Sequence, residues 1–339
     1  MKALVLVKKT DPFHSFEIRD LPKPQPKTGE VLIKVSASGL NFADVMARKG
    51  LYKEAPPLPS VLGYDVSGTI EELGEGVTRF QIGDRVTAMT RFGGYAEYVT
   101  THASAVAIIP SHIDNATATA LTTQYCTAYY AAAEMVQLHA GDKVLVQSGA
   151  GGVGTALIQY ARYKGCEIFA TAGSQDKMEY LRSIGVDHPI QYTLQDFEKE
   201  IKEITNGEGV DTIFDAVGGS SVKKGFRSLA AGGRIVCYGA AEMSDKNLFG
   251  KINAALGFGF YHPAMLMTPS KSMIGINMLR IADHKPAMIQ KCLESVISLT
   301  KEGVFTPLIG KIFKATEIGL AHEYLEKRKS MGKVVVSWE

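Results

Sequence analysis

Four glycines within six positions are the clearest chemical signal in the sequence. They lie in the stretch V-L-V-Q-S-G-A-G-G-V-G, residues 144–154, directly after an apolar, β-prone run. Gly149, Gly151 and Gly154 have the spacing G-x-G-x-x-G, in which the first glycine permits a tight turn, the second lets the backbone approach a pyrophosphate and the third lets a helix pack on the strand. The spacing alone is a weak signal. Here it joins a predicted strand to a predicted helix, and in that context it predicts a dinucleotide site.

The end of the next predicted strand bears on the choice between NAD and NADP. NAD sites usually place an Asp or Glu there, about 20 residues after the loop, to hold the ribose 2′-hydroxyl. This strand ends A-T-A-G-S, residues 170–174, and Lys177 follows. A small residue, a hydroxyl and a cation suit a 2′-phosphate. Asp176 would repel a phosphate unless it serves only as an acid at a helix start. We therefore favour NADPH, with NADH as the alternative.

The sequence predicts no metal site. A catalytic zinc needs three or four clustered ligands, whereas the eight histidines and four cysteines are scattered, without C-x-x-C or H-E-x-x-H spacing. Tyr160 and Lys164 have the Y-x-x-x-K spacing of short-chain dehydrogenases. They fall on the helix that follows the glycine loop, where they would pack on the sheet or face solvent, so we do not assign them a catalytic role.

Composition and charge exclude several classes of function. The chain has 339 residues, 37 basic and 35 acidic, so its net charge of +2 gives no basic surface for nucleic acid. The widely spaced cysteines favour a reducing, cytoplasmic location over a disulfide-linked secreted fold. No membrane span is expected, because the longest apolar stretch, Ile252 to Met267, is interrupted by Gly, His and Pro. That stretch is expected to be a buried helix and loop or a subunit contact.

The pattern of elements predicts an α/β protein with two parts. To about Leu121 the chain has short β-like runs separated by Gly, Pro and Asp, which indicate a compact β-rich domain. From Lys143 strands alternate with helices of about a dozen residues, which predicts a doubly wound parallel sheet. The last run, V-V-V-S-W, is a strand that could rejoin the first domain.

Several motifs, taken in order, resemble the medium-chain dehydrogenase/reductase superfamily. They are G-L-N-F-A-D-V-M-A-R-K-G-L-Y, P-S-V-L-G-Y-D-V-S-G, G-D-R-V, A-G-G-V-G and L-E-K-R-K-S-M-G-K-V-V-V. The chain is most similar to the zinc-free quinone oxidoreductases, the zeta-crystallin group, and its first motif to the branch of the synaptic vesicle membrane protein homologues. The resemblance implies a GroES-like catalytic domain, residues 1–122 with 291–339, and a Rossmann domain, residues 123–290.

The resemblance also accounts for the missing metal ligands. Zinc alcohol dehydrogenases of the superfamily carry a cysteine where this sequence has Asn41, and Gly-His-Glu where it has Gly63-Tyr64-Asp65. Asp65 departs from the usual Glu of that motif. The four-cysteine structural zinc lobe is absent as well.

The resemblance implies a set of NADPH-binding residues in addition to the three glycines of the fingerprint. Asn41 and Thr127 match positions beside the nicotinamide and its ribose or phosphate, and Gly239 follows a strand at the end where such sheets bind ligands. Gly152 and Val153 match the pyrophosphate turn, and Gly173, Ser174 and Lys177 match the 2′-phosphate subsite. Tyr192 matches a residue on the adenosine side. Arg328 and Lys333 match residues of the closing motif that reach back to the cofactor.

The expected reaction is hydride transfer from NADPH to a quinone or a related conjugated carbonyl, without zinc. Tyr52 and Tyr64 are the expected hydrogen-bond donors to the developing oxyanion, and Asn41 the residue that helps to place the ring. Two alternatives stay open: reduction of a 2-alkenal or enone, and an NADPH-binding protein whose role is an interaction rather than turnover. Chiefly from the family, a homodimer is expected, with the strand Ser272 to Met278 pairing across a two-fold axis.

Overall fold

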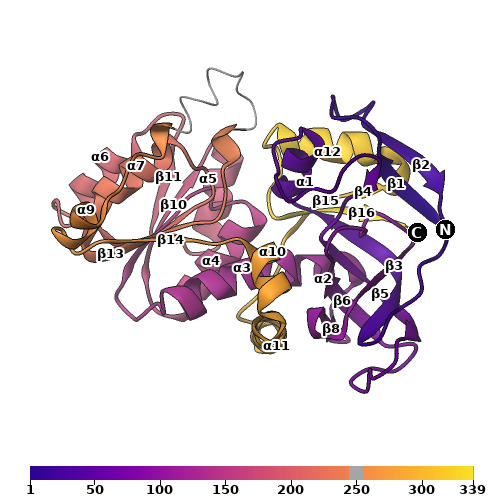
Figure 1. The fold of residues 1–339 in the computed structure, drawn as a ribbon. Coiled ribbons are helices and arrows are strands. Elements are labelled where there is room, and N and C mark those ends of the chain that lie inside the picture. Colours follow the sequence, from indigo (N-terminus) through magenta and orange to yellow (C-terminus); the bar gives the residue numbers. More distant parts are fainter. Residues whose placement is uncertain (244–255, 339) are drawn as a thin grey trace. The chain divides into compact units, whose positions relative to one another are not determined.

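Six parallel strands form the central sheet of an α/β unit, Thr127–Asn277 (Figure 1). The structure, a computed structural model, describes residues 1–243 and 256–338. The strand order is β11-β10-β9-β12-β13-β14, and every neighbouring pair is parallel. The strands are β9 Lys143–Val146, β10 Glu167–Ala172, β11 His188–Gln191, β12 Val210–Asp215, β13 Leu229–Cys237 and β14 Ser272–Gly275.

The order of these strands reverses next to β9. The chain runs from β9 outward through β10 to β11, then returns to the other side of β9 and continues through β12, β13 and β14. A doubly wound sheet binds ligands at this reversal, beyond the carboxyl ends of its strands. Helices connect the strands: α4 Gly152–Tyr163, α5 Gln175–Ser183, α6 Phe197–Ile204, α7 Ser220–Ser228 and α9 Pro263–Met267, with short turns of helix η2 Tyr130–Met135 and η3 Ala241–Met243.

Strands β9 to β13 of this sheet have a core of large apolar side chains. Leu145, Phe169, Ile213 and Ile235 are fully buried and form one cluster across four neighbouring strands. The runs that supply them are rich in Val, Ile and Phe, as expected for strands covered on both faces. This core fixes the ends of the strands, where the glycine loop emerges.

The β-rich unit consists of Met1–Cys126 with Met278–Glu339. A seven-stranded sheet has the order β15-β16-β3-β5-β6-β8, with β7 also paired to β3, and a three-stranded sheet has the order β2-β1-β4. The strands are β1 Lys2–Leu6, β2 Phe16–Asp20, β3 Glu30–Leu40, β4 Ser60–Val61, β5 Asp65–Leu73, β6 Arg85–Met89, β7 Tyr98–His102, β8 Val106–Ile108, β15 Ile309–Lys314 and β16 Lys333–Ser337.

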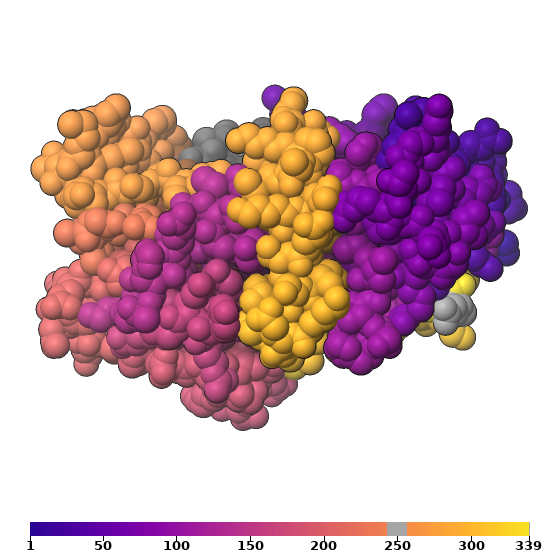
Figure 2. Space-filling model, turned by 90° about the horizontal axis from the view of Figure 1, so that it is seen from below, coloured from indigo at the N-terminus to yellow at the C-terminus, as the bar shows by residue number. Residues whose placement is uncertain are grey.

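Helices cover parts of this unit. They are α1 Phe42–Arg48, α2 Asn115–Leu121, α3 Thr123–Tyr129 (which crosses into the α/β unit), α10 Met278–His284, α11 Pro286–Lys301 and α12 Ile318–Glu326, with short η1 Ala103–Ala105 and η4 Ala315–Glu317. Helix α11 packs against η1, β8 and α2 through its apolar side. Its other side lies at the surface, in yellow-orange beside the purple atoms of this unit in Figure 2.

The closing strand brings the end of the chain back to its beginning. Strand β16 pairs antiparallel with β3, with Val334 opposite Leu40 and Ser337 opposite Ala37. Residues almost 300 positions apart in the sequence therefore lie side by side, and β16 begins at Lys333, next to the start of α1. The doubly wound α/β sheet and the separate β-rich part that the sequence predicts are confirmed. The exact bounds of independently folding domains stay a prediction.

One expectation from the sequence needs correction. Of the apolar stretch 252–267, residues 252–255 lie outside the described part, and no residue from 256 to 267 is buried. Leu256, Phe260 and Met267 expose 55%, 83% and 76% of their surface. The buried-helix interpretation is therefore wrong for 256–267, because Phe258, Tyr261 and Leu266 pack on the core only in part. A subunit contact there stays a prediction.

Candidate functional site

The glycine loop between β9 and α4 has no space for side chains at two of its three fingerprint positions. A Cβ on Gly154 would lie 2.5 Å from the carbonyl oxygen of Ser148 and 2.7 Å from the Cα of Gly149. A Cβ on Gly149 would lie 2.9 Å from Ala170 and 3.0 Å from Leu181, both on the neighbouring strand and helix. The first and third glycines thus let the turn close and α4 pack on the sheet. Gly151 has more space, with its nearest contact at 3.3 Å.

Two polar side chains fix the start of the loop. The backbone N–H of Ser148, which has a positive φ of 57°, donates to Thr171 Oγ1 at 3.1 Å. Thr171 Oγ1 in turn donates to Gln147 Oε1 at 2.6 Å, and both side chains are buried. Gln147 Nε2 is buried without a partner among the described residues. These hydrogen bonds therefore fix the loop to the ends of β9 and β10.

The beginning of α4 fits the pyrophosphate of a dinucleotide. Gly151 caps the helix, no side chain satisfies the cap, and Gly152 and Val153 occupy the first turn. The first N–H groups of a helix lack partners within the helix and carry partial positive charge, which favours a bound phosphate. A loop that needs glycine at Gly149 and Gly154, at a helix start without a side-chain cap, suits a closely approaching phosphate.

The predicted 2′-phosphate residues gather where β10 ends. Strand β10 stops at Ala172, Gly173 follows, Ser174 caps α5, and Lys177 lies in the first turn of that helix. Tyr192 follows β11 and lies over Gly173, where an added Cβ would lie 2.7 Å from its Cζ. Tyr192 is 47% exposed, which leaves it accessible to an adenosine. No carboxylate stands at the end of β10, but Asp176 lies in the same turn as Lys177.

Gly239 and Thr127 are the remaining predicted cofactor residues of the α/β unit. Gly239 follows β13 at its carboxyl end, where a Cβ would lie 2.5 Å from the carbonyl oxygen of Ala216. The chain after β12 therefore passes directly against it. Thr127 is buried on α3. Contacts of either residue with NADPH stay a prediction.

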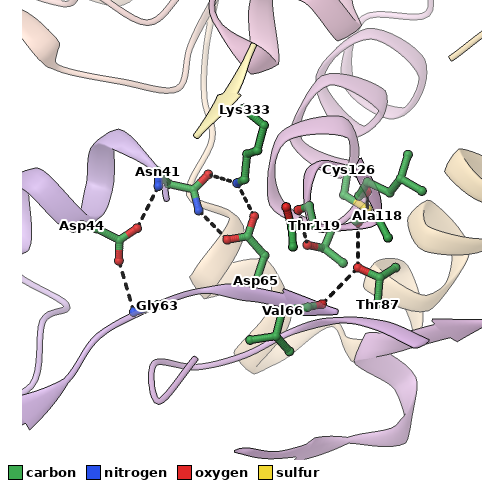
Figure 3. A network of polar contacts seen from close by, with 12 residues as sticks. Asn41, Asp44, Gly63, Asp65, Val66, Thr87, Ala118, Thr119, Cys126 and Lys333 are labelled. Carbon is green, nitrogen blue, oxygen red and sulfur yellow. Dashed lines mark hydrogen bonds and ion pairs between the residues drawn. The ribbon is translucent and has the colours of Figure 1, made fainter. Parts of the chain in front are cut away.

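In the β-rich unit, Asn41, Asp65 and Lys333 form a buried polar network (Figure 3). Asn41 Nδ2 donates to Asp65 Oδ1 at 2.7 Å, and Lys333 Nζ donates to Asn41 Oδ1 at 3.0 Å. Lys333 Nζ also forms an ion pair with Asp65 Oδ2. Lys333 and Asp65 have no exposed surface and Asn41 has 8%. The sequence assigned Lys333 to the cofactor, and the structure places its ammonium on Asn41 and Asp65.

A second buried carboxylate, Asp44, holds the backbone of Asn41. Its Oδ2 accepts from the Asn41 N–H at 2.9 Å, and its Oδ1 accepts from the Gly63 N–H at 3.2 Å. Burial raises the pKa of Asp44 to about 7, aided by the charge of Asp65 and opposed by the two backbone N–H groups and by Lys333. Burial also raises the pKa of Asp65, and the ion pair and hydrogen bonds of Lys333 act in the opposite direction.

The two predicted donor tyrosines are neighbours. The rings of Tyr52 and Tyr64 meet edge to face with centroids 6.2 Å apart, and Phe92 lies 5.1 Å from Tyr64 on the other side. Burial raises the pKa of Tyr52 to about 12 and the pKa of Tyr64 still further, so both phenols keep their protons. Tyr64 is 4% exposed, and its hydroxyl has no partner among the described residues. A buried hydroxyl without a partner needs an explanation, and a bound ligand would provide one.

Sequence reasoning missed two features of this region. Asp44 was not assigned a role, although its position three residues after Asn41 is the spacing at which an acidic side chain caps a helix start. The pairing of Lys333 with Asp65 had no sequence signal, because it joins residues 268 positions apart. Arg328, by contrast, is exposed after the end of α12 and has a positive φ of 55°.

Within residues 1–243 and 256–338, no three His, Cys, Asp or Glu side chains are grouped so that they could hold a metal ion. None of the helices in that part of the chain has the length and apolar character needed to cross a bilayer.

Sequence comparison identifies known relatives. The zinc-binding dehydrogenase family matches residues 152–300, and the alcohol dehydrogenase GroES-like domain matches residues 27–111. The synaptic vesicle membrane protein VAT-1 homolog of Danio rerio is 34% identical over 321 residues, which is 94% of this chain and 66% of that protein. The Homo sapiens VAT-1 homolog is 33% identical over 322 residues, 94% of this chain and 81% of that protein. The chain thus spans just under two thirds of the first relative.

Solved structures with the same fold include several reductases. Pseudomonas syringae pv. tomato quinone oxidoreductase superposes with a TM-score of 0.86 at 26% identity, covering 99% of both chains. A mycobacterial protein solved in complex with NADPH gives 0.87 at 28% identity and covers 99% of this chain and 100% of that one. The CurK enoyl reductase gives 0.86 at 29% identity, covering 99% of this chain and 98% of that one.

The donor set of the network does not suit the zinc ion in the name of the matching family. Zinc is bound by thiolate, imidazole and carboxylate ligands. Here one carboxylate, Asp65, is already paired with the ammonium of Lys333, and the neighbouring side chain is the amide of Asn41. A metal ion at this place would have to displace a buried positive charge.

Proposed function

Since the chain belongs to the medium-chain dehydrogenase/reductase superfamily, we propose that it is an NADPH-dependent oxidoreductase that transfers hydride to quinones or related conjugated carbonyls without zinc. The observation that carries the proposal is the donor set around Asn41, which offers N–H and O–H groups, while the described residues hold no group of side chains that could bind a metal ion. Such groups activate a carbonyl only weakly, so they suit an acceptor that is already electron-poor. The similarity to a quinone oxidoreductase of the same fold supports this choice.

NADPH is the cofactor, and when bound it supplies the hydride. In the proposal, the start of α4 holds its pyrophosphate, and Gly173, Ser174 and Lys177 hold the 2′-phosphate. Tyr192 lies on the adenosine side. The other predicted cofactor residues, Thr127, Gly239 and Arg328, complete the proposed contacts. This chain's own residues then bind and orient the cofactor, as the superfamily's nucleotide domains do.

The acceptor is placed in the proposal by Asn41, Tyr52 and Tyr64. Reduction of a quinone puts negative charge on a carbonyl oxygen, and donors fixed before the reaction stabilise that charge. Both phenols are protonated at neutral pH, since burial raises the pKa of Tyr52 to about 12 and that of Tyr64 further. The unpartnered hydroxyl of Tyr64 supports a role as donor.

A second candidate reaction is reduction of a 2-alkenal or enone at its carbon–carbon double bond. The similarity to an enoyl reductase, at a higher identity than to the quinone oxidoreductase, favours it. The same donors would stabilise the enolate oxygen that forms when hydride adds to the β-carbon. Both reactions use one constellation of residues, so substrate profiling separates them.

Assembly and location are further parts of the proposal. Strand β14 lies at the edge of the six-stranded sheet, where its second side can pair with another strand. The exposed apolar residues before it, Phe260 and Met267, would be covered in a homodimer built on this edge. A cytoplasmic location agrees with four cysteines that form no disulfide.

The direct test measures NADPH oxidation with naphthoquinones and, in parallel, with 2-alkenals. We expect turnover with at least one class, and a Tyr52→Phe variant should lose roughly tenfold or more of kcat because one oxyanion donor is removed. Tyr163→Phe, on the exposed side of α4, serves as the control and should keep its activity. If NADPH binds but no acceptor of either class is reduced, the non-catalytic alternative replaces this proposal.

A further inference from the structure

The carboxamide of Asn41 is held at both ends by groups of opposite character. Its Oδ1 accepts from Lys333, which can only donate hydrogen bonds, and its Nδ2 donates to Asp65, which as a carboxylate can only accept. The oxygen and nitrogen of an amide have nearly the same size, so the hydrogen-bond partners decide which way the group points. Here the reversed orientation would place Nδ2 against an ammonium and Oδ1 against a carboxylate. The side chain is therefore fixed in one orientation.

The backbone around this network is shaped for the lysine. Lys333 enters from β16 and passes across β3 at Gly39, where an added Cβ would lie 2.7 Å from Nζ and 3.0 Å from Asp65 Oδ2. Gly39 has no positive φ, so the need for glycine here comes from the crossing side chain. Asp44 holds the Asn41 backbone N–H in addition. Four elements (β3, β5, β16 and the start of α1) thus converge on one amide.

This arrangement has a chemical consequence for Asn41. An amide oxygen that accepts from an ammonium is polarised, which strengthens its N–H groups as donors. One N–H of Nδ2 is used by Asp65 and one remains. Asn41 is the least buried of the three residues, at 8% exposed. It is therefore the member of the network that can offer a hydrogen bond to a ligand.

We propose that Lys333 and Asp65 are positioning residues that fix Asn41 as a hydrogen-bond donor to the carbonyl oxygen of the acceptor. The inference rests on the proposed reductase function for its kinetic part. The ammonium and the carboxylate do not touch the acceptor and act through Asn41. The two buried charges stabilise the network only as a pair, because loss of either partner leaves the other charged and unpaired.

The first experiment separates positioning from folding. Lys333→Met alone leaves Asp65 buried and unpaired, and we expect its melting temperature to fall by roughly 10 °C. The double variant Lys333→Met with Asp65→Asn removes both charges, and its melting temperature should return to within about 3 °C of that of the wild type. Lys329→Met, an exposed lysine four residues before Lys333, is the matched control and should melt like the wild type.

The kinetic readout is taken on the double variant, which keeps the fold. We expect kcat to fall roughly tenfold while KM for NADPH stays within about threefold, because the donor is lost and the pyrophosphate and 2′-phosphate residues of the α/β unit are unchanged. In an Asn41→Ala background the same two substitutions should cost nothing further, since residues that act through Asn41 are non-additive with it. Wild-type turnover in the double variant, or additive losses in the Asn41→Ala background, would overturn the proposal.

A second readout needs no turnover and stands if the proposed reaction is wrong. In protein labelled with 15N at asparagine, the side-chain amide protons of Asn41 should exchange with solvent far more slowly than those of Asn206, which lies exposed after α6. The double variant should lose this protection. Equal exchange at Asn41 and Asn206 in the wild type contradicts a fixed carboxamide, even if the double variant cannot be folded.

Discussion

The two units build their candidate binding groups in opposite ways. In the α/β unit the loop before α4 works because side chains are missing, and the groups it offers are backbone N–H donors. In the β-rich unit the groups are side chains, and a buried ammonium and carboxylate hold the amide of Asn41 between them. The glycine loop therefore depends on the absence of side chains, and the network around Asn41 depends on closely packed side chains with opposite charges.

This difference predicts different ways to fail. A backbone site tolerates changes in the surrounding side chains but fails when one atom is added where the chain closes on itself. A buried ion pair is strongly destabilised when one partner is replaced, although both partners can be replaced together. The following predictions test each half of this contrast.

The largest effect is expected for Gly154→Ala. In an ordinary helix this change would stabilise by up to about 1 kcal/mol. Here the new Cβ would lie 2.5 Å from the carbonyl oxygen of Ser148 and 2.7 Å from the Cα of Gly149, both of them backbone atoms. The turn must open, and we expect NADPH to bind roughly a hundredfold more weakly, which is about 2.7 kcal/mol. Isothermal titration of NADPH into the purified variant measures this.

The matched control is Gly275→Ala at the end of β14. An added Cβ there has no neighbour within 4 Å, and the residue has no positive φ. It should bind NADPH like the wild type. If Gly154→Ala also bound NADPH normally, the crowded loop would not be the pyrophosphate site.

The two regions also differ in how far the sequence predicts them. The glycine loop, its strand and its helix are local, so spacing and residue type within residues 144–163 predict both the fold and the chemistry. The end of β10 with Gly173 and Lys177 is similar, although the approach of Tyr192 needs the pairing of β10 with β11. Local periodicity carries this information because each residue's neighbours are close in sequence.

The network around Asn41 could be predicted only in part. The resemblance pointed to Asn41 and to Lys333 separately, but not to their contact, which depends on the register of β16 on β3. The need for glycine at Gly39 follows from the same crossing, and no local rule would give it. The partners of a buried charge cannot be predicted from the sequence here, because they depend on the register between strands that are far apart in the chain.

Buried titratable groups give the β-rich unit a pH dependence that we expect to see in its stability. His322 on α12 has no exposed surface, and neither ring nitrogen has a partner among the described residues. Burial, with a contribution from Arg48, lowers its pKa to about 3. The unfolded chain takes up a proton near pH 6.5 and the folded one near 3, so stability is present above 6.5 and is lost as the pH falls toward 3. From pH 7 to 5 the loss is about 2 kcal/mol.

Asp44 opposes this change, so the test compares variants. Its pKa is raised by burial to about 7, so its contribution is largest at low pH and is lost as the pH rises through 7. Urea unfolding at pH 7 and pH 5 should show that His322→Leu gains about 2 kcal/mol relative to the wild type at the lower pH. His112→Leu, at an exposed position, should show no such gain. Parallel pH profiles for wild type and His322→Leu would mean that His322 is not held neutral.

The smallest effect concerns the choice of coenzyme in the α/β unit. Lys177 lies in the first turn of α5, beside Gly173 and Ser174, where we propose that it meets the 2′-phosphate. Lys177→Ala should weaken NADPH binding about tenfold, or about 1.4 kcal/mol, and leave NADH binding unchanged, since NADH lacks that phosphate. Lys164→Ala, at the far end of α4, is the control. Equal losses for both coenzymes would show that Lys177 supports α5 rather than reading the phosphate. Because Asp176 is adjacent to Lys177, Asp176→Asn should have the opposite effect and increase the affinity for NADPH but not for NADH. The two titrations together show how much side-chain charge on α5 adds to the binding by the backbone donors of α4.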